Sequence, residues 1–115
     1  MKRRVILESP YAGDVDLNER YARAALRDSL LRGEAPLASH LLYTQPGVLD
    51  DQDPDERRMG IEAGLAWGPH AEATVVYWDF DISSGMRHGI YRATRERRPV
   101  ECRCLPGWGH KVFAR

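Results

Sequence analysis

The segment from Ala73 to Asp79 constrains the fold more than any other part of this sequence. It reads Ala-Thr-Val-Val-Tyr-Trp-Asp, so it is rich in β-branched and aromatic residues and almost continuously apolar. Such a run is typical of a strand that is buried on both faces, at the centre of a parallel sheet. Parallel neighbours have to be joined by long crossovers, which are usually helices. The segment therefore predicts an α/β fold.

The remainder of the chain supplies further strands and helices in alternation. Short apolar runs predict strands at residues 4–8, 37–43 and 99–105. Helical spacing and end signals predict helices at residues 18–32, with Asn18 as N-cap and Gly33 as stop, at 54–67 and at 86–97. In the second of these helices, the expected inner face carries Met59, Ala63 and Ala66, with Ile61 and Leu65 beside them.

This order predicts a single domain, residues 1–115, built as a small doubly wound parallel sheet with helices on both faces. Right-handed crossovers leave few other arrangements, and a sheet of about four to five strands fits the length. In folds of this class a ligand binds beyond the carboxyl ends of the strands. The loops that follow the strands are therefore where a functional site is expected.

Charge and composition exclude several classes of function. The chain has 17 Lys and Arg against 17 Asp and Glu, so it lacks the basic surplus of a general nucleic-acid or anionic-membrane binder. No apolar run approaches the roughly 18–20 residues that cross a bilayer, and residues 5–7 are too short for the core of a signal peptide. Cys102 and Cys104 are spaced poorly for a disulfide, and no second close pair of ligands accompanies them. We expect a cytoplasmic protein with neither metal nor cofactor.

Polar and aromatic residues lie within or just after three of the predicted strands. Glu8 ends the first strand, and Ser9, Tyr11 and Gly13 follow it. His40 lies in the second apolar segment. A third group begins at the end of the buried strand, namely Asp79, Asp81, Ser83, Ser84, Gly85, Met86 and Arg87. A Ser-Ser-Gly turn at the start of a helix can present free N–H groups to a phosphate or carboxylate. The pattern predicts an anion-binding pocket.

Each of these residues also has a purely structural interpretation. Serine at a helix start is most often an N-cap, and aspartates after a strand commonly form turns. His40 fits a core histidine as well as a ligand-binding one, and Tyr11 fits a packing residue as well as a ring that stacks on a base. The run Glu56-Arg57-Arg58 is typical of a solvated helix face.

Three motifs together resemble the nucleoside 2-deoxyribosyltransferase-like superfamily, which includes the deoxynucleoside 5′-monophosphate N-glycosidases. They are a strand followed by Ser-Pro-Tyr-x-Gly, a helix with Asn18 and Tyr21, and Gly85-Met86-x-x-Gly89 after an apolar strand that ends in Asp. Short phage and bacterial members are more similar still, in Pro36-x-Ala38-Ser39-His40-Leu41-Leu42-Tyr43, Ile82-Ser83-x-Gly85-Met86 and Pro99-Val100-Glu101.

The resemblance implies a compact parallel α/β sandwich and enzymes that cleave an N-glycosidic bond. In that family a glutamate on the helix of the glycine motif attacks the anomeric carbon, while a second carboxylate and a tyrosine assist. The resemblance places Tyr11 near the sugar, Asp79 or Asp81 near the assisting carboxylate, and the turn from Ser83 to Gly85 at the 5′-phosphate. Here Arg87 stands where the glutamate is required, and a guanidinium that stays protonated is no nucleophile.

Three functions follow as hypotheses. The first is a homodimeric binder of a nucleotide or ADP-ribose-type ligand, lacking the glutamate, that senses or sequesters a phage-defence nucleotide. The second is an N-glycosidase or deoxyribosyltransferase whose carboxylate has moved to Glu8, Asp79, Asp81 or Glu56. The third is an interaction protein with a vestigial pocket. Small members of the superfamily self-associate, which is why a homodimer is expected.

Overall fold

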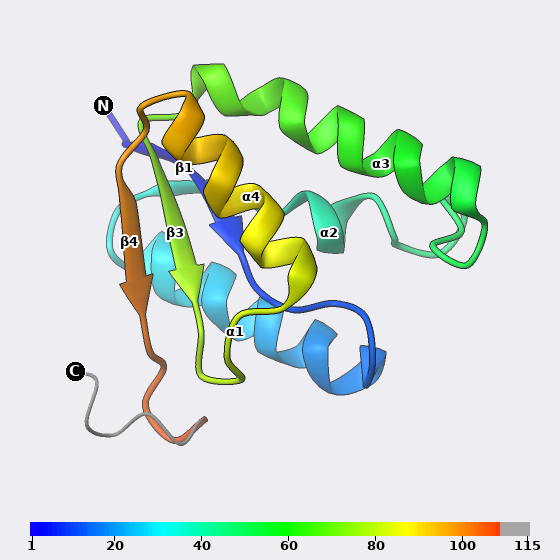
Figure 1. The fold of residues 1–115 in the computed structure, drawn as a ribbon. Coiled ribbons are helices and arrows are strands. Elements are labelled where there is room, and N and C mark those ends of the chain that lie inside the picture. Colours follow the sequence, from blue (N-terminus) through cyan, green and yellow to red (C-terminus); the bar gives the residue numbers. More distant parts are fainter. Residues whose placement is uncertain (109–115) are drawn as a thin grey trace.

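Four parallel strands form one sheet in the computed structural model, which describes residues 1–108 (Figure 1). Their order is β2 (Ala35–Leu37), β1 (Arg4–Glu8), β3 (Ala73–Tyr77) and β4 (Val100–Arg103). β1 and β3 are central, with Val5 opposite Ala73 and Glu8 opposite Val76. The chain leaves β1 toward one edge and β3 toward the other, so the carboxyl ends of these two strands form the switch point at which ligands bind in such sheets.

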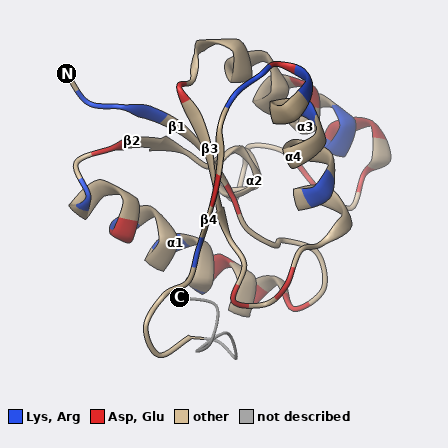
Figure 2. Ribbon diagram, turned by 60° about the vertical axis from the view of Figure 1, so that its left-hand side comes forward, with Lys and Arg blue, Asp and Glu red and all other residues tan. Residues whose placement is uncertain are grey.

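Helices cover both faces of the sheet, which confirms the predicted doubly wound class. α1 (Val15–Leu31) lies on one face, and α3 (Pro54–Trp67) and α4 (Ser84–Arg95) lie on the other (Figure 2). The four-residue helix α2 (Ser39–Leu42) follows β2, and a short 3-10 turn, η1 (Gly68–His70), follows α3. Within residues 1–108, none of the helices combines the length and the hydrophobicity that a transmembrane span requires.

Strand β3 is the centre of the core, as its sequence predicts. All five of its residues are buried, and Tyr21, Ala22 and Ala25 of α1 pack into the same cluster. Together with Val5 and Leu7 of β1 they form the layer between the sheet and α1. Burying apolar side chains on both faces of β3 stabilises the arrangement and holds the loop after β3 in position.

The predicted start of α1 at Asn18 is wrong. The helix begins at Val15, and the N-cap is Asp14, whose carboxylate accepts a hydrogen bond from the backbone N–H of Leu17. Asn18 is buried and instead donates to the carbonyl oxygens of Tyr11 and Ala12, at 2.9 and 3.1 Å. Its amide therefore fixes the loop between β1 and α1 that carries Tyr11.

The strand predicted at residues 37–43 is wrong for most of that range. Only residues 35–37 pair with β1, and a helical turn follows at once. The carbonyl groups at the end of this turn are satisfied by Thr44 and Gln45, whose side chains donate to the carbonyl oxygens of His40 and Leu41. Such side-chain capping stabilises a turn that is too short to be stable alone.

Helix α3 faces the protein with a side that was expected only in part. Met59 of the predicted face is 57% exposed and Ala66 is exposed, whereas Ala63 is half-buried and Ile61 and Leu65, beside that face, line the cavity at the end of β1. The inner side is formed by Gly60 and Gly64, where an added methyl group would press on Leu49 and overlap the side chain of Ser39. The side of α3 that lies against α2 therefore carries glycines rather than apolar side chains, and this allows the two helices to approach closely. The remaining element ends differ from prediction by about two residues.

Candidate functional site

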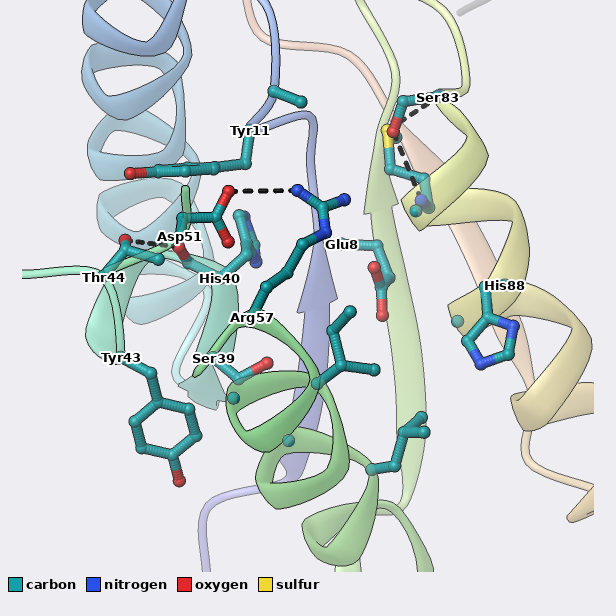
Figure 3. Close-up of a pocket in the computed structure, with 18 of the residues that line it drawn as sticks. Glu8, Tyr11, Ser39, His40, Tyr43, Thr44, Asp51, Arg57, Ser83 and His88 are labelled. Carbon is teal, nitrogen blue, oxygen red and sulfur yellow. Dashed lines mark hydrogen bonds and ion pairs between the residues drawn. The ribbon is translucent and has the colours of Figure 1, made fainter. Parts of the chain in front are cut away.

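A cavity of about 190 Å³ opens at the carboxyl end of β1, among α2, α3 and the first turn of α4 (Figure 3). For scale, a dry cavity of about 150 Å³ holds a benzene ring. Most of the site residues predicted from sequence line it: Glu8, Ser9, Tyr11, His40, Ser83, Ser84, Gly85 and Met86. Tyr11 and the Ser83 turn, more than seventy residues apart in sequence, thus share one cavity.

Four predicted residues are not among those that line the cavity: Gly13, Asp79, Asp81 and Arg87. Asp79 is buried, and its carboxylate accepts hydrogen bonds from the hydroxyl of Tyr21 at 2.6 Å and from the backbone N–H of Leu105 at 2.9 Å. It ties α1 to the ends of β3 and β4. Asp81 and Arg87 are exposed, and Asp81 has a positive φ of 68°. The positions of these four residues do not support the roles that the sequence predicted for them at the site.

Glu8 is the carboxylic acid that the structure brings into the cavity from β1 (Figure 3). No hydrogen bond or ion pair joins its carboxyl group to another of residues 1–108. Gly89 of α4 packs against it so closely that a methyl group there would overlap the carboxyl group. Burial raises the pKa of Glu8 from 4.5 to about 8, although the charge of Arg98 acts in the opposite direction. Near neutral pH the side chain is largely a neutral hydrogen-bond donor.

Ser9 and His40 form a hydrogen-bonded pair in the cavity wall. The Ser9 hydroxyl oxygen lies 2.6 Å from Nε2 of His40, and the two residues follow β1 and β2 respectively. Burial lowers the pKa of His40 to about 4, so the imidazole is neutral near pH 7. The pair therefore offers uncharged donors and acceptors rather than a positive charge.

The first turn of α4 caps its own helix and also faces the cavity. Ser83 is the N-cap, and its hydroxyl accepts a hydrogen bond from the backbone N–H of Met86 at 3.2 Å. Ser84 and Gly85 line the cavity beside it. The structural interpretation of Ser83 is thus confirmed. The partial positive charge at this helix end still points toward the site.

Arg57 is a cavity residue that sequence reasoning missed. The run Glu56-Arg57-Arg58 was expected to be solvated, yet Arg57 reaches from α3 into the cavity, where it meets Asp51 at 3.1 Å (Figure 3). Arg58 follows the prediction and points outward, with its side chain 65% exposed. The signal that could have identified this face is the spacing of Gly60 and Gly64, which marks the side of α3 that approaches other elements.

Arg98 is the second arginine at the cavity, and it serves the fold. Its guanidinium donates to the hydroxyl of Thr74, the carbonyl oxygen of Gly68 and the carboxylate of Glu96, at 3.0, 2.7 and 2.6 Å. Its side chain is only 6% exposed. These bonds join β3, η1 and the end of α4 below Glu8.

The sequence matches the model of a protein family described as Domain of unknown function (DUF7768), over residues 3–103. The chain belongs to this family. The matched range runs from the start of the sheet to the last residue of β4 and includes every residue of the predicted site. No curated protein matches the sequence. The match to this family does not test the resemblance of the chain to the nucleoside 2-deoxyribosyltransferase-like superfamily, which stays a prediction.

Proposed function

We propose that the protein binds a nucleotide-type ligand, a nucleoside 5′-phosphate or an ADP-ribose-like compound, in the cavity at the end of β1. The observation that carries the proposal is the convergence of the Tyr11 loop, the Ser9–His40 pair and the Ser83 turn on one cavity. These segments come from different loops at the switch point of the sheet, where folds of this class bind ligands.

The chemistry of the cavity wall suits such a ligand. Ser9, Ser39, His40 and Thr44 supply neutral donors and acceptors, which match sugar hydroxyls and the edges of a base. The ring of Tyr11 offers a face for stacking. Arg57 and the first turn of α4 supply positive charge for a phosphate.

The biological role we propose is that of a small protein that senses or sequesters a nucleotide signal, as in phage defence. We also propose that it acts as a homodimer, for which the exposed side chains of Trp67 and Tyr91 provide aromatic surface. Sedimentation velocity at micromolar concentration tests this: a single species at the mass of the monomer would contradict it.

Ligand-induced stabilisation tests the binding function. The melting temperature is measured with each of the four deoxynucleoside 5′-monophosphates, with ADP-ribose and with NAD. A ligand at a hundredfold excess over its Kd stabilises by about 2.7 kcal/mol, which raises the melting temperature of a domain this size by roughly 10 °C. Tyr11→Ala is expected to reduce the shift and Arg58→Gln, on the outer side of α3, to leave it unchanged. No shift with any compound would contradict the proposal.

A second candidate function is hydrolysis of the N-glycosidic bond, which the position and protonation of Glu8 favour. In this reaction a water oxygen would bond to the anomeric carbon as the carbon–nitrogen bond breaks. The base nitrogen would take the proton of Glu8, and the water would return a proton to the carboxylate. Release of free base by the wild type, abolished in Glu8→Gln and retained in Arg58→Gln, would establish the enzyme. If the protein binds a compound but releases no free base, the binding function stands and the hydrolase function is contradicted.

A further inference from the structure

The two arginines of the cavity differ in how many of their N–H donors already bind other groups of the protein. Arg98 donates to three oxygen atoms of the protein and is almost fully buried. The side chain of Arg57 is 46% exposed, and within residues 1–108 it has Asp51 as its single ion-pair partner. A guanidinium has five N–H donors, so Arg57 retains donors for a ligand.

Asp51 is held next to Arg57 by the backbone around it. The carboxylate of Asp53 accepts hydrogen bonds from the N–H groups of Asp55 and Glu56 at the start of α3. Glu56 in turn accepts one from the N–H of Asp50, at 2.8 Å. The loop with Asp51 is thereby attached to the same helix turn that carries Arg57, and the two charges face the cavity together (Figure 3).

We infer that Arg57 binds the phosphate of the ligand and that Asp51 competes with that phosphate for Arg57. The inference rests on the proposed function and specifies it. A phosphate ester carries more charge than a carboxylate and accepts two parallel hydrogen bonds from a guanidinium. A phosphorylated ligand exchanges one ion pair for a stronger one, whereas a neutral nucleoside leaves the pair with Asp51 intact. Arg57 on α3 then holds the phosphate, a residue to which the sequence assigned no such role, and the Ser83 turn lines the same cavity.

Asp51 sets how strongly the site distinguishes phosphorylated from unphosphorylated compounds. Its carboxylate both occupies the guanidinium and repels an approaching anion, so it lowers the affinity for phosphate esters without affecting neutral nucleosides. Because the pair is partly exposed, its loss costs the fold little, at most about 1 kcal/mol. Asp51 and Arg57 can therefore be changed separately without unfolding the protein.

The experiment is calorimetric titration of four proteins with matched pairs of compounds, each deoxynucleoside and its 5′-monophosphate. In the wild type we expect the monophosphate of the preferred base to bind about tenfold more tightly than its nucleoside, which corresponds to about 1.4 kcal/mol. Arg57→Gln should bring the two affinities within about twofold. Asp51→Asn should tighten the monophosphate alone, by about fivefold to tenfold. Arg58→Gln, whose side chain faces solvent, should match the wild type.

The outcomes separate the inference from the proposed function. If Arg57→Gln keeps the wild-type preference for the monophosphate, the phosphate binds elsewhere and the inference is wrong while the binding function stands. A wild type that binds nucleoside and monophosphate equally, or an Asp51→Asn variant that weakens the monophosphate, leads to the same conclusion. If none of the four folded proteins binds any of these nucleosides and monophosphates, the inference is wrong. If the wild type also shows no melting shift with ADP-ribose or NAD, the proposed function fails as well. Thermal unfolding without ligand confirms that each variant is folded.

Discussion

The buried carboxyl group of Glu8 makes the stability of the folded protein depend on pH in a direction opposite to that of most acids. Its pKa is 4.5 in the unfolded chain and about 8 in the fold. Between these values the folded state keeps a proton that the unfolded state has lost. Stability is therefore highest below pH 4.5 with respect to this group, falls as the pH rises, and levels off above pH 8.

The size of this effect follows from the shift. Each pH unit within the window changes the free energy of unfolding by about 1.4 kcal/mol, so the loss between pH 5 and pH 7 is about 3 kcal/mol. Glu8→Gln has nearly the same shape and does not titrate. We expect its free energy of unfolding to exceed that of the wild type at pH 7, and the difference between the two proteins to grow as the pH rises from 5.

Urea unfolding of both proteins at pH 5, 6, 7 and 8, followed by tryptophan fluorescence, measures the difference. Other titrating groups are common to both proteins and cancel in the subtraction. Glu62→Gln, an exposed acid on α3, is the matched control and should follow the wild type throughout. If the curves of the wild type and Glu8→Gln stay parallel from pH 5 to pH 8, Glu8 is charged in the fold and the argument about its environment is wrong.

Three further changes test other parts of the structure. Gly89→Ala should destabilise the wild type by about 1–3 kcal/mol through overlap with Glu8, and far less in a Glu8→Ala background, as a double-mutant cycle in urea would show. Arg103→Met removes the bidentate partner of the buried Glu34, which keeps its contacts with Arg3 and Ser29, and should cost about 2–3 kcal/mol at pH 7. The pKa of Glu34 is lowered to about 2 by Arg103, so this cost should shrink as the pH falls from 4.5 toward 2, and a constant cost would contradict the assignment. Tyr21→Phe removes the hydroxyl that binds the carboxylate after β3, and chemical denaturation should show a loss of about 1–3 kcal/mol.

The fold could be predicted because its strongest signals are local. The apolar run at residues 73–77 needs burial on both faces, and the alternation of strands and helices then leaves few arrangements. The errors arose where a short segment had two possible states. Residues 39–42 are apolar enough for a strand, and their helical turn depends on capping by Thr44 and Gln45. Asn18 looks like an N-cap in sequence, but its bonds to the Tyr11 loop form only in the folded chain.

The sequence by itself determined the class of the fold. It also determined that Glu8, Ser9, Tyr11, His40 and the Ser83 turn meet at the carboxyl ends of the strands. This was possible because the carboxyl ends of parallel strands lie at the same end of the sheet, whatever the details of packing. Only the tertiary structure decided which polar side chains face the cavity. Asp79 is buried and bonded to Tyr21, whereas Arg57 lines the cavity from the side of α3 that carries the closely packed Gly60 and Gly64. Such positions depend on which distant segments pack together. A local pattern such as the spacing of Gly60 and Gly64 marks a closely packed side of a helix but does not identify the segment that packs there.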